Sequence, residues 1–117
     1  MSTLPSAFAE PPLRVHRAFG FWSRLAGLLA RPQLHKGEAL HLVPCTAVHT
    51  WFMPYPIDVV FIDRMGRVLR VAAEVPPWRA VFCRAAHGAL ELRAGQASRY
   101  GMAPGVTLDR AVLGHRP

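Results

Sequence analysis

The sequence predicts a mainly β fold: a compact β-sandwich or barrel of short strands with one helix near the N-terminus. Two observations lead to this expectation. Short apolar runs separated by turn residues follow one another from residue 38 onward, whereas a helical spacing of apolar residues occurs once, before Pro32. Of the 117 residues, 51% are hydrophobic and 18% are charged, which suits one domain with a packed core. We expect a flexible arm over residues 1–12 and a single β-rich domain over residues 13–117.

The helix is expected in the segment Phe21–Ala30, where apolar residues recur at helical spacing. Pro32 ends this pattern, because proline removes a backbone donor and clashes with the preceding turn. The preceding segment, Leu13–Ala18, is predicted to be a short strand.

A β-hairpin is the strongest prediction in the rest of the chain. Two β-branched and aromatic runs, Ile57–Ile62 and Arg67–Val75, flank turn residues that include Gly66. The other predicted elements are a strand from Glu38, a brief extension at Ala47–Thr50, strands at Ala80–Arg84 and Ala89–Arg93, a helical turn at Gly95–Tyr100, and a strand pair around Val106–Leu113. In the strand from Glu38, Leu40 and Leu42 are expected on one face. In the strand Ala89–Arg93, Leu90 and Leu92 are expected to face inward, and Glu91 and Arg93 outward.

The basic charge of the chain is spread along the sequence. The formal net charge is +7 and the pI is about 11.0, yet arginines stand singly and Lys36 is the sole lysine. No block of adjacent cations therefore marks a dedicated nucleic-acid site. We predict that any nucleic-acid binding is weak, indifferent to sequence and lost with salt. The two cysteines, Cys45 and Cys83, are too few for a disulfide scaffold, so reduced thiols are expected.

Targeting and membrane signals are missing from the sequence pattern. Residues 1–12 lack the apolar run of an export signal. Runs such as Ile57–Ile62 are far shorter than the roughly 20 residues that cross a bilayer. We expect a cytoplasmic, monomeric protein that uses no cofactor, binds no specific nucleic acid and does not associate with membranes.

Three strings, in the right order, resemble the prokaryotic family called domain of unknown function 192. They are RLAGLLAR at Arg24–Arg31, PIDVVFID at Pro56–Asp63 with Met53 before it, and LELRAG at Leu90–Gly95. The resemblance covers about residues 13–113. It implies a small, mainly β domain, often found alone, for which no biochemical activity is generally accepted.

This chain departs from that family at the central motif. The usual Trp-Met-Lys-Asn-Thr lead-in is replaced by a shorter loop that contains Trp51-Phe52-Met53-Pro54-Tyr55. Any ligand role of the family's Lys, Asn and Thr therefore does not carry over. Many family members also begin with an export signal, which this sequence does not show.

Asp58 is the most informative single residue, because its carboxylate stands between Ile57 and Val59 in an apolar strand. Such a group must be paired, hydrogen-bonded or protonated. One interpretation makes it a general base, a metal ligand or a ligand anchor. The other, which we favour, makes it a structural acceptor for an arginine or for the backbone N–H groups of the Met53–Ile57 loop, where Pro56 interrupts strand pairing.

Two further chemistries remain open. A soft metal site would need Cys45, His49, Asp58 and Cys83 to converge in space, although they lack the spacing of zinc motifs. A thiol nucleophile with a histidine base would need close approach of Cys45 to His49, or of Cys83 to His87.

We therefore predict a small non-catalytic domain that binds a small molecule or a protein partner. Its candidate face is the loop from His49 to Asp58 together with the corner from Glu91 to Gly95. The alternative is a small enzyme that uses the metal or thiol site described above. The aromatic residues of the loop and Trp78 could line a pocket or a partner surface, although such residues are more often core. The candidate ligand-binding residues are His49, Trp51, Met53, Asp58, Glu91 and Gly95.

Overall fold

The computed structural model describes residues 13–19, 34–109 and 113, and the structural statements below concern these residues. They form seven strands and one short helix. The elements are β1 (Arg14–Phe19), β2 (Glu38–Val43), β3 (Ala47–His49), β4 (Ile57–Ile62), β5 (Val68–Val75), β6 (Ala80–Phe82), β7 (Gly88–Arg93) and α3 (Gln96–Arg99).

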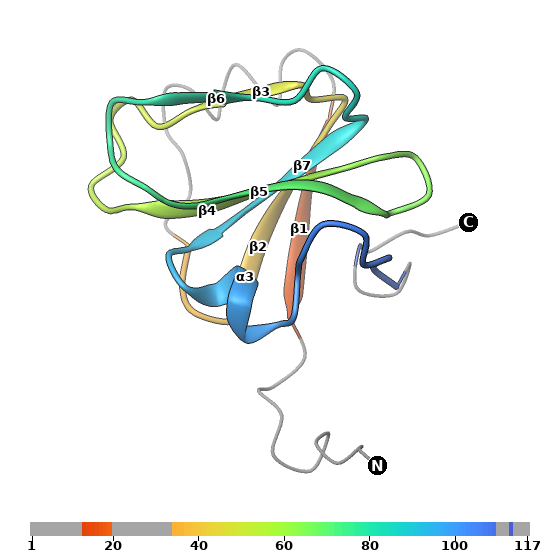
Figure 1. The fold of residues 1–117 in the computed structure, drawn as a ribbon. Coiled ribbons are helices and arrows are strands. Elements are labelled where there is room, and N and C mark those ends of the chain that lie inside the picture. Colours follow the sequence, from red (N-terminus) through yellow and green to blue (C-terminus); the bar gives the residue numbers. More distant parts are fainter. Residues whose placement is uncertain (1–12, 20–33, 110–112, 114–117) are drawn as a thin grey trace, which may run out of the picture.

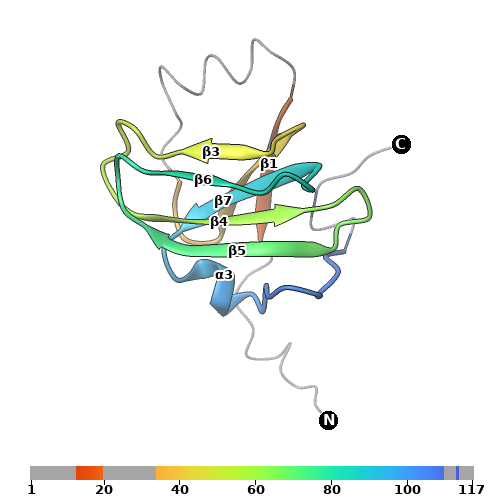
Figure 2. The same ribbon diagram turned by 45° about the horizontal axis from the view of Figure 1, so that its top comes forward.

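The strands form two sheets. The main sheet has the order β1-β2-β7-β4-β5, and the small sheet pairs β3 with β6. All neighbours are antiparallel except β1 and β2, which are parallel. Figures 1 and 2 show the small sheet lying over one face of the main sheet, with α3 at the other face. The parallel register aligns Arg14 with Glu38 and Phe19 with Val43.

Both faces of the main sheet are covered, which explains why β4 reads as a continuous apolar run. Every residue of Ile57–Ile62 is buried. A strand that alternates its side chains between two buried faces does not need polar residues on either side. Its two hydrogen-bonded neighbours are β5 and β7, so β4 lies inside the sheet.

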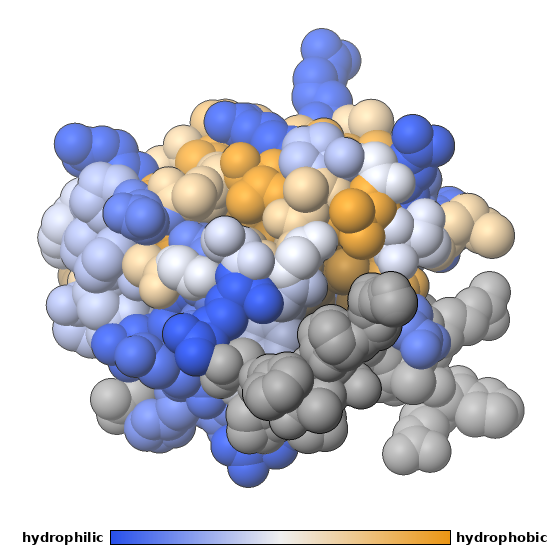
Figure 3. Space-filling view, turned by 60° about the horizontal axis from the view of Figure 1, so that its bottom comes forward, coloured by the Kyte–Doolittle hydropathy of each residue, from blue (hydrophilic) through white to orange (hydrophobic). Residues whose placement is uncertain are grey.

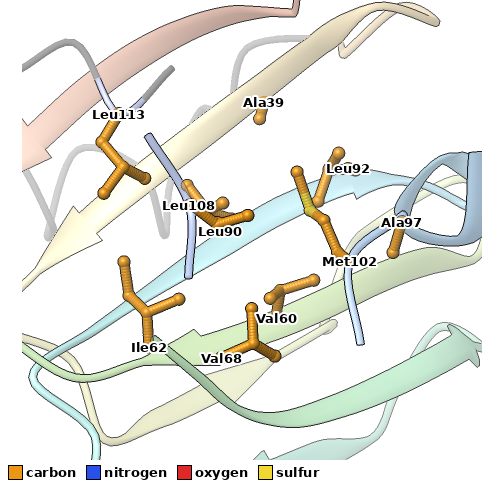
Figure 4. Close-up of a cluster of buried hydrophobic side chains, with 10 residues drawn as sticks. All are labelled: Ala39, Val60, Ile62, Val68, Leu90, Leu92, Ala97, Met102, Leu108 and Leu113. Carbon is orange, nitrogen blue, oxygen red and sulfur yellow. The ribbon is translucent and has the colours of Figure 1, made fainter. Parts of the chain in front are cut away.

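Two apolar clusters lie on opposite faces of the main sheet. On the α3 face, strands β4, β5 and β7 pack against α3 and the segment that follows it, as Figure 4 shows. On the other face, the clustered side chains come from the main sheet and from the small sheet, where Val48 of β3 contributes. Figure 3, which views the molecule from the α3 side, shows apolar surface among hydrophilic side chains.

The mainly β class and the predicted β4–β5 hairpin are confirmed. Neither sheet closes on itself, so the barrel alternative is wrong. The helix expected at residues 21–30 lies outside the described residues. The helix that the structure describes is α3, near the C-terminal end, and it matches the helical turn predicted at Gly95–Tyr100. No helix in the described part of the chain is long and apolar enough to cross a membrane.

Two detailed predictions are wrong. Glu91 does not face solvent; it is 1% exposed, because the face of β7 opposite Leu90 and Leu92 is also covered. Within the described residues, 106–109 form no strand pair; one isolated bridge joins Arg67 to Thr107. Leu108 instead packs into the cluster on the α3 face. Its apolar side chain therefore helps to cover the main sheet and does not indicate a strand.

Candidate functional site

Asp58 is a structural clasp on the α3 face. Its side chain is 1% exposed, and its two oxygens accept three backbone N–H groups. Oδ1 accepts from Glu74 at 2.9 Å, and Oδ2 accepts from Gly95 at 3.0 Å and Ala97 at 2.9 Å. One carboxylate thus ties β4 to the edge strand β5 and to the start of α3. The favoured acceptor role is confirmed, but the donors are not those of the Met53–Ile57 loop.

The backbone around this clasp explains why those donors turn inward. Gly95 has φ +90°, a left-handed conformation that glycine adopts without steric cost. Its N–H points to the carboxylate, and α3 begins with the next residue. Glu74 has φ +53° in a region where the β4–β5 register shifts, so its N–H turns away from the regular ladder. Asp58 satisfies donors that the sheet and the helix leave unpaired.

A second clasp joins the β3–β4 loop to the β5–β6 loop, which Figures 1 and 2 show side by side. Thr50 is fully buried at its centre. Its N–H donates to the Arg79 carbonyl at 2.8 Å, and its hydroxyl accepts from the Arg79 N–H at 2.9 Å. The same hydroxyl donates to the Pro76 carbonyl at 2.7 Å, and the Thr50 carbonyl accepts from Trp78 at 3.1 Å. The two loops therefore hold one another in a defined geometry.

Three aromatic residues beside the Thr50 clasp are exposed, and we call them the aromatic tip: Trp51, Phe52 and Trp78. Their exposed fractions are 49%, 74% and 57%. Phe52 and Trp78 meet edge to face with ring centroids 4.8 Å apart, one from each loop. Trp51 stacks on His49 at 4.6 Å. The rings support one another while leaving much of their area open to a partner.

The backbone under the aromatic tip is strained. Phe52 has φ +66° and Trp78 has φ +67°. The left-handed region costs bulky residues about 1–2 kcal/mol each, because Cβ approaches the following carbonyl oxygen. The Thr50 carbonyl accepts from the N–H of Trp78 and from that of Met53, the residue after Phe52, so it fixes the backbone at both positions. Residues under such strain gather at functional sites, where the surrounding structure fixes them.

The predicted ligand-binding face is divided by the structure. His49 and Trp51 lie together at the small sheet, while Met53 is buried in the cluster between the sheets. Asp58 and Gly95 bond to each other on the opposite face of the main sheet. The corner that follows Glu91 is built around Arg93, whose guanidinium lies 4.1 Å above the Tyr55 ring and donates to the Leu34 carbonyl.

The residues of the alternative enzyme site do not converge. Cys45 is buried in the cluster between the sheets, and Cys83 packs against the same cluster, so both thiols lie on the face opposite Asp58. Both cysteines are free thiols, as expected. Among the described residues, no three His, Cys, Asp or Glu side chains are placed to hold a metal ion. The Cys45 thiol donates to the Ala47 carbonyl at 3.1 Å.

Two features of the tip could be read from the sequence and two could not. Trp51 and Phe52 lie in a proline-flanked loop, and Trp78 follows Pro76-Pro77, so both positions are in connections where a large ring has no strand neighbours. The sequence does not show that these two loops meet, because the pairing of β3 with β6 joins segments about 30 residues apart. It also does not single out Thr50 as the contact between them.

Together these observations define a small, mainly β domain built from two unclosed sheets. The chain belongs to the family domain of unknown function 192, described as "Uncharacterized ACR", which matches residues 6–110. The resemblance found in the sequence is thus confirmed. No curated protein matches the chain.

Two solved structures share the fold. One is a protein of unknown function from Novosphingobium aromaticivorans, with 24% identity and a TM-score of 0.68, covering 80% of this chain and 71% of the other. The second is a protein from Sinorhizobium meliloti described as a candidate transcription regulator, with 24% identity and a TM-score of 0.67, covering 78% of this chain and 76% of the other. At this identity the likeness concerns the fold.

Proposed function

We propose that this chain is a non-catalytic binding domain and that its contact surface is the aromatic tip. The observation that carries the proposal is the conformation of Phe52 and Trp78: two exposed rings on left-handed backbone, locked by the buried Thr50. Exposed apolar rings add nothing to a core, and strained backbone lowers stability. A role in binding accounts for both costs.

The proposal changes the predicted face in a specific way. Trp51 and His49 remain, and Phe52 and Trp78 join them. Asp58 is not part of the proposed contact surface, because its carboxylate already accepts hydrogen bonds from three backbone N–H groups. The Sinorhizobium meliloti neighbour, described as a candidate transcription regulator, is compatible with a binding role.

The test uses the dye 8-anilinonaphthalene-1-sulfonate, an apolar anion that reports accessible hydrophobic surface. We expect the folded chain to bind the dye, and Phe52→Ala and Trp78→Ala to weaken binding severalfold while shifting the free energy of unfolding by no more than about 0.5 kcal/mol. Met65→Ala is the matched control, since Met65 is 70% exposed in the hairpin turn at the other end of β4.

Two outcomes would contradict the proposal. One is dye binding that is the same for the parent and both tip variants. The other is a fall of several kcal/mol in the free energy of unfolding for either variant, because the rings would then serve the fold.

A further inference from the structure

We infer that the partner of the aromatic tip is single-stranded nucleic acid, bound without sequence preference along the small sheet. This inference rests on the proposed binding function and names its partner class. The juxtaposition behind it is one of exposed rings and arginines on two segments whose sequence contains no Asp or Glu.

Folding gathers arginines that stand singly in the sequence. Arg79 follows Trp78 in the tip, is exposed and donates to the Trp78 carbonyl at 3.3 Å. Arg84 is exposed just beyond β6. The Arg70 guanidinium reaches from β5 to the carbonyl of Phe82 on β6. Three cations thus flank one strand, which the linear spacing of arginines does not reveal.

The aromatic surface extends from the tip along the same strand. Phe82 is 60% exposed and has the same side-chain direction as Ala80, while Val81 between them packs toward the core. From Trp78 to Phe82 is four residues, or about 13 Å along an extended chain. Rings therefore stand at both ends of β6, with arginines beside each.

Acidic residues are missing from both segments that build this face. The sequence has no Asp or Glu from residue 39 to 57, or from residue 75 to 90. The carboxylates that follow these segments, Asp58 and Glu91, are buried in the main sheet. Glu74, which precedes the second segment, is exposed, and its backbone N–H donates to Asp58. Arg70, Arg79 and Arg84 add to the positive charge of a chain whose formal net charge is +7.

This chemistry favours a polyanion with accessible planar groups. Proteins that bind single strands combine cations that follow the phosphates with aromatic side chains on which bases stack. A duplex hides its base faces, so it would use the arginines and leave the rings unused. An acidic peptide would meet the arginines, but it offers rings only at its aromatic residues, whereas every nucleotide supplies a planar base for the four exposed rings. Stacking is also tolerant of sequence, in keeping with the dispersed-charge prediction from the sequence.

The experiment measures fluorescence anisotropy of a labelled oligothymidine of about 20 nucleotides with the full chain. We expect saturable binding that is weaker for a duplex of the same length. Trp78→Ala should weaken oligothymidine binding about tenfold, consistent with loss of one stacked base. With about three phosphate contacts, raising salt from 50 to 200 mM should weaken binding by roughly 20-fold. The double variant Arg79→Ala/Arg84→Ala should show a salt slope that is shallower by about 1.4.

Matched controls are Arg64→Ala and Met65→Ala, which remove one exposed arginine and one exposed apolar side chain from the hairpin turn. Both should bind as the parent does. The inference is overturned if oligothymidine does not bind, if the duplex binds as well as the single strand, or if Trp78→Ala binds like Met65→Ala. Tip-dependent binding to anionic phosphatidylglycerol vesicles without binding to oligothymidine would also overturn it. Dye binding at the tip without oligonucleotide binding would leave the proposed function standing and remove this partner.

Discussion

Asp58 on the main sheet and Thr50 between two loops each form a buried polar clasp, and the clasps differ in what surrounds them. The Asp58 carboxylate accepts hydrogen bonds from the backbone of β5 and α3, and the apolar side chains on the same face pack into a buried cluster. At Thr50 the hydroxyl joins two loops, and the neighbouring rings point to solvent. A buried polar residue thus serves the fold in both places, but only the Thr50 clasp presents a surface. Polarity in an apolar segment is therefore a poor guide to the functional site here.

The largest expected effect on stability is that of Asp58→Ala. Removing the carboxylate leaves three backbone N–H groups without their acceptor, at a cost of about 3 kcal/mol in the free energy of unfolding. Asp58→Asn should lower it less, because one acceptor oxygen remains. Urea denaturation measures both. Asp63→Ala is the control: Asp63 accepts from Met65 and Arg67 at 2.9 Å in an exposed turn, where water can replace it, so its loss should be about 1 kcal/mol or less. Equal losses at Asp58 and Asp63 would contradict the clasp.

Thr50→Val should have the next largest effect. The substitution keeps the shape and removes the hydroxyl that serves the Arg79 N–H and the Pro76 carbonyl, so we expect a loss of about 2 kcal/mol. The order of the tip should also fall, seen as faster hydrogen exchange at the Trp78 amide. Thr46→Val, at an exposed position, should change the free energy of unfolding by no more than about 0.5 kcal/mol. A Thr50→Val variant as stable as Thr46→Val would show that the Thr50 hydroxyl does not stabilise the contact between the two loops.

Phe52→Gly should change the free energy of unfolding very little. Glycine relieves the strain at φ +66°, which offsets both the lost ring contact with Trp78 and the greater entropy of the unfolded chain. The free energy of unfolding should stay within about 0.5 kcal/mol of the parent, whereas Met65→Gly, at a position without positive φ, should lower it by about 0.5–1 kcal/mol. A clear loss at Phe52 that exceeds the loss at Met65 would show that the ring stabilises the fold.

The smallest expected effect is at Glu38, at the start of β2. The pKa of Glu38 is lowered, chiefly by a hydrogen bond from the His35 N–H and further by His16 and Arg14. A carboxyl whose pKa is lower when folded stabilises the protein above its unfolded pKa, and this contribution disappears as the pH falls through the folded pKa. Glu38→Gln should thus be slightly less stable than the parent at neutral pH and equal to it in strong acid. A difference that persists or grows in acid, measured by urea midpoints across pH, would contradict this.

Sequence patterns predict the strands well where each has its own signal. Ile57–Ile62 is found to the residue, because a continuous β-branched run is bounded by Pro56 and by turn residues. The parallel pairing of β1 with β2 and the burial of Glu91 are not predicted, since both depend on which elements cover a face. The alternation of apolar and polar residues along one strand does not show whether another part of the chain covers the outer face of that strand.

The sequence predicts only part of the candidate site, because the site depends on contacts between segments distant in the chain. Asp58 stands out in the sequence because it is a charged residue in an apolar run. In the structure its carboxylate accepts hydrogen bonds from the backbone of β5 and α3. Trp51 is predictable as a candidate from the sequence, but Phe52 and Trp78 come together through the pairing of β3 with β6. The arginines beside β6 stand singly in the sequence and become neighbours only in the fold.

We thus expect the stability of the domain to depend on the Asp58 clasp and its binding to depend on the aromatic tip. The most direct test measures two quantities, the urea midpoint and the affinity for oligothymidine, on Asp58→Asn and Trp78→Ala. We predict that Asp58→Asn has a lower midpoint and parental affinity at temperatures where it is folded, and that Trp78→Ala has a parental midpoint and about tenfold weaker affinity. The opposite pattern, in which Asp58→Asn loses affinity at an unchanged midpoint while Trp78→Ala loses stability and binds normally, would contradict the account.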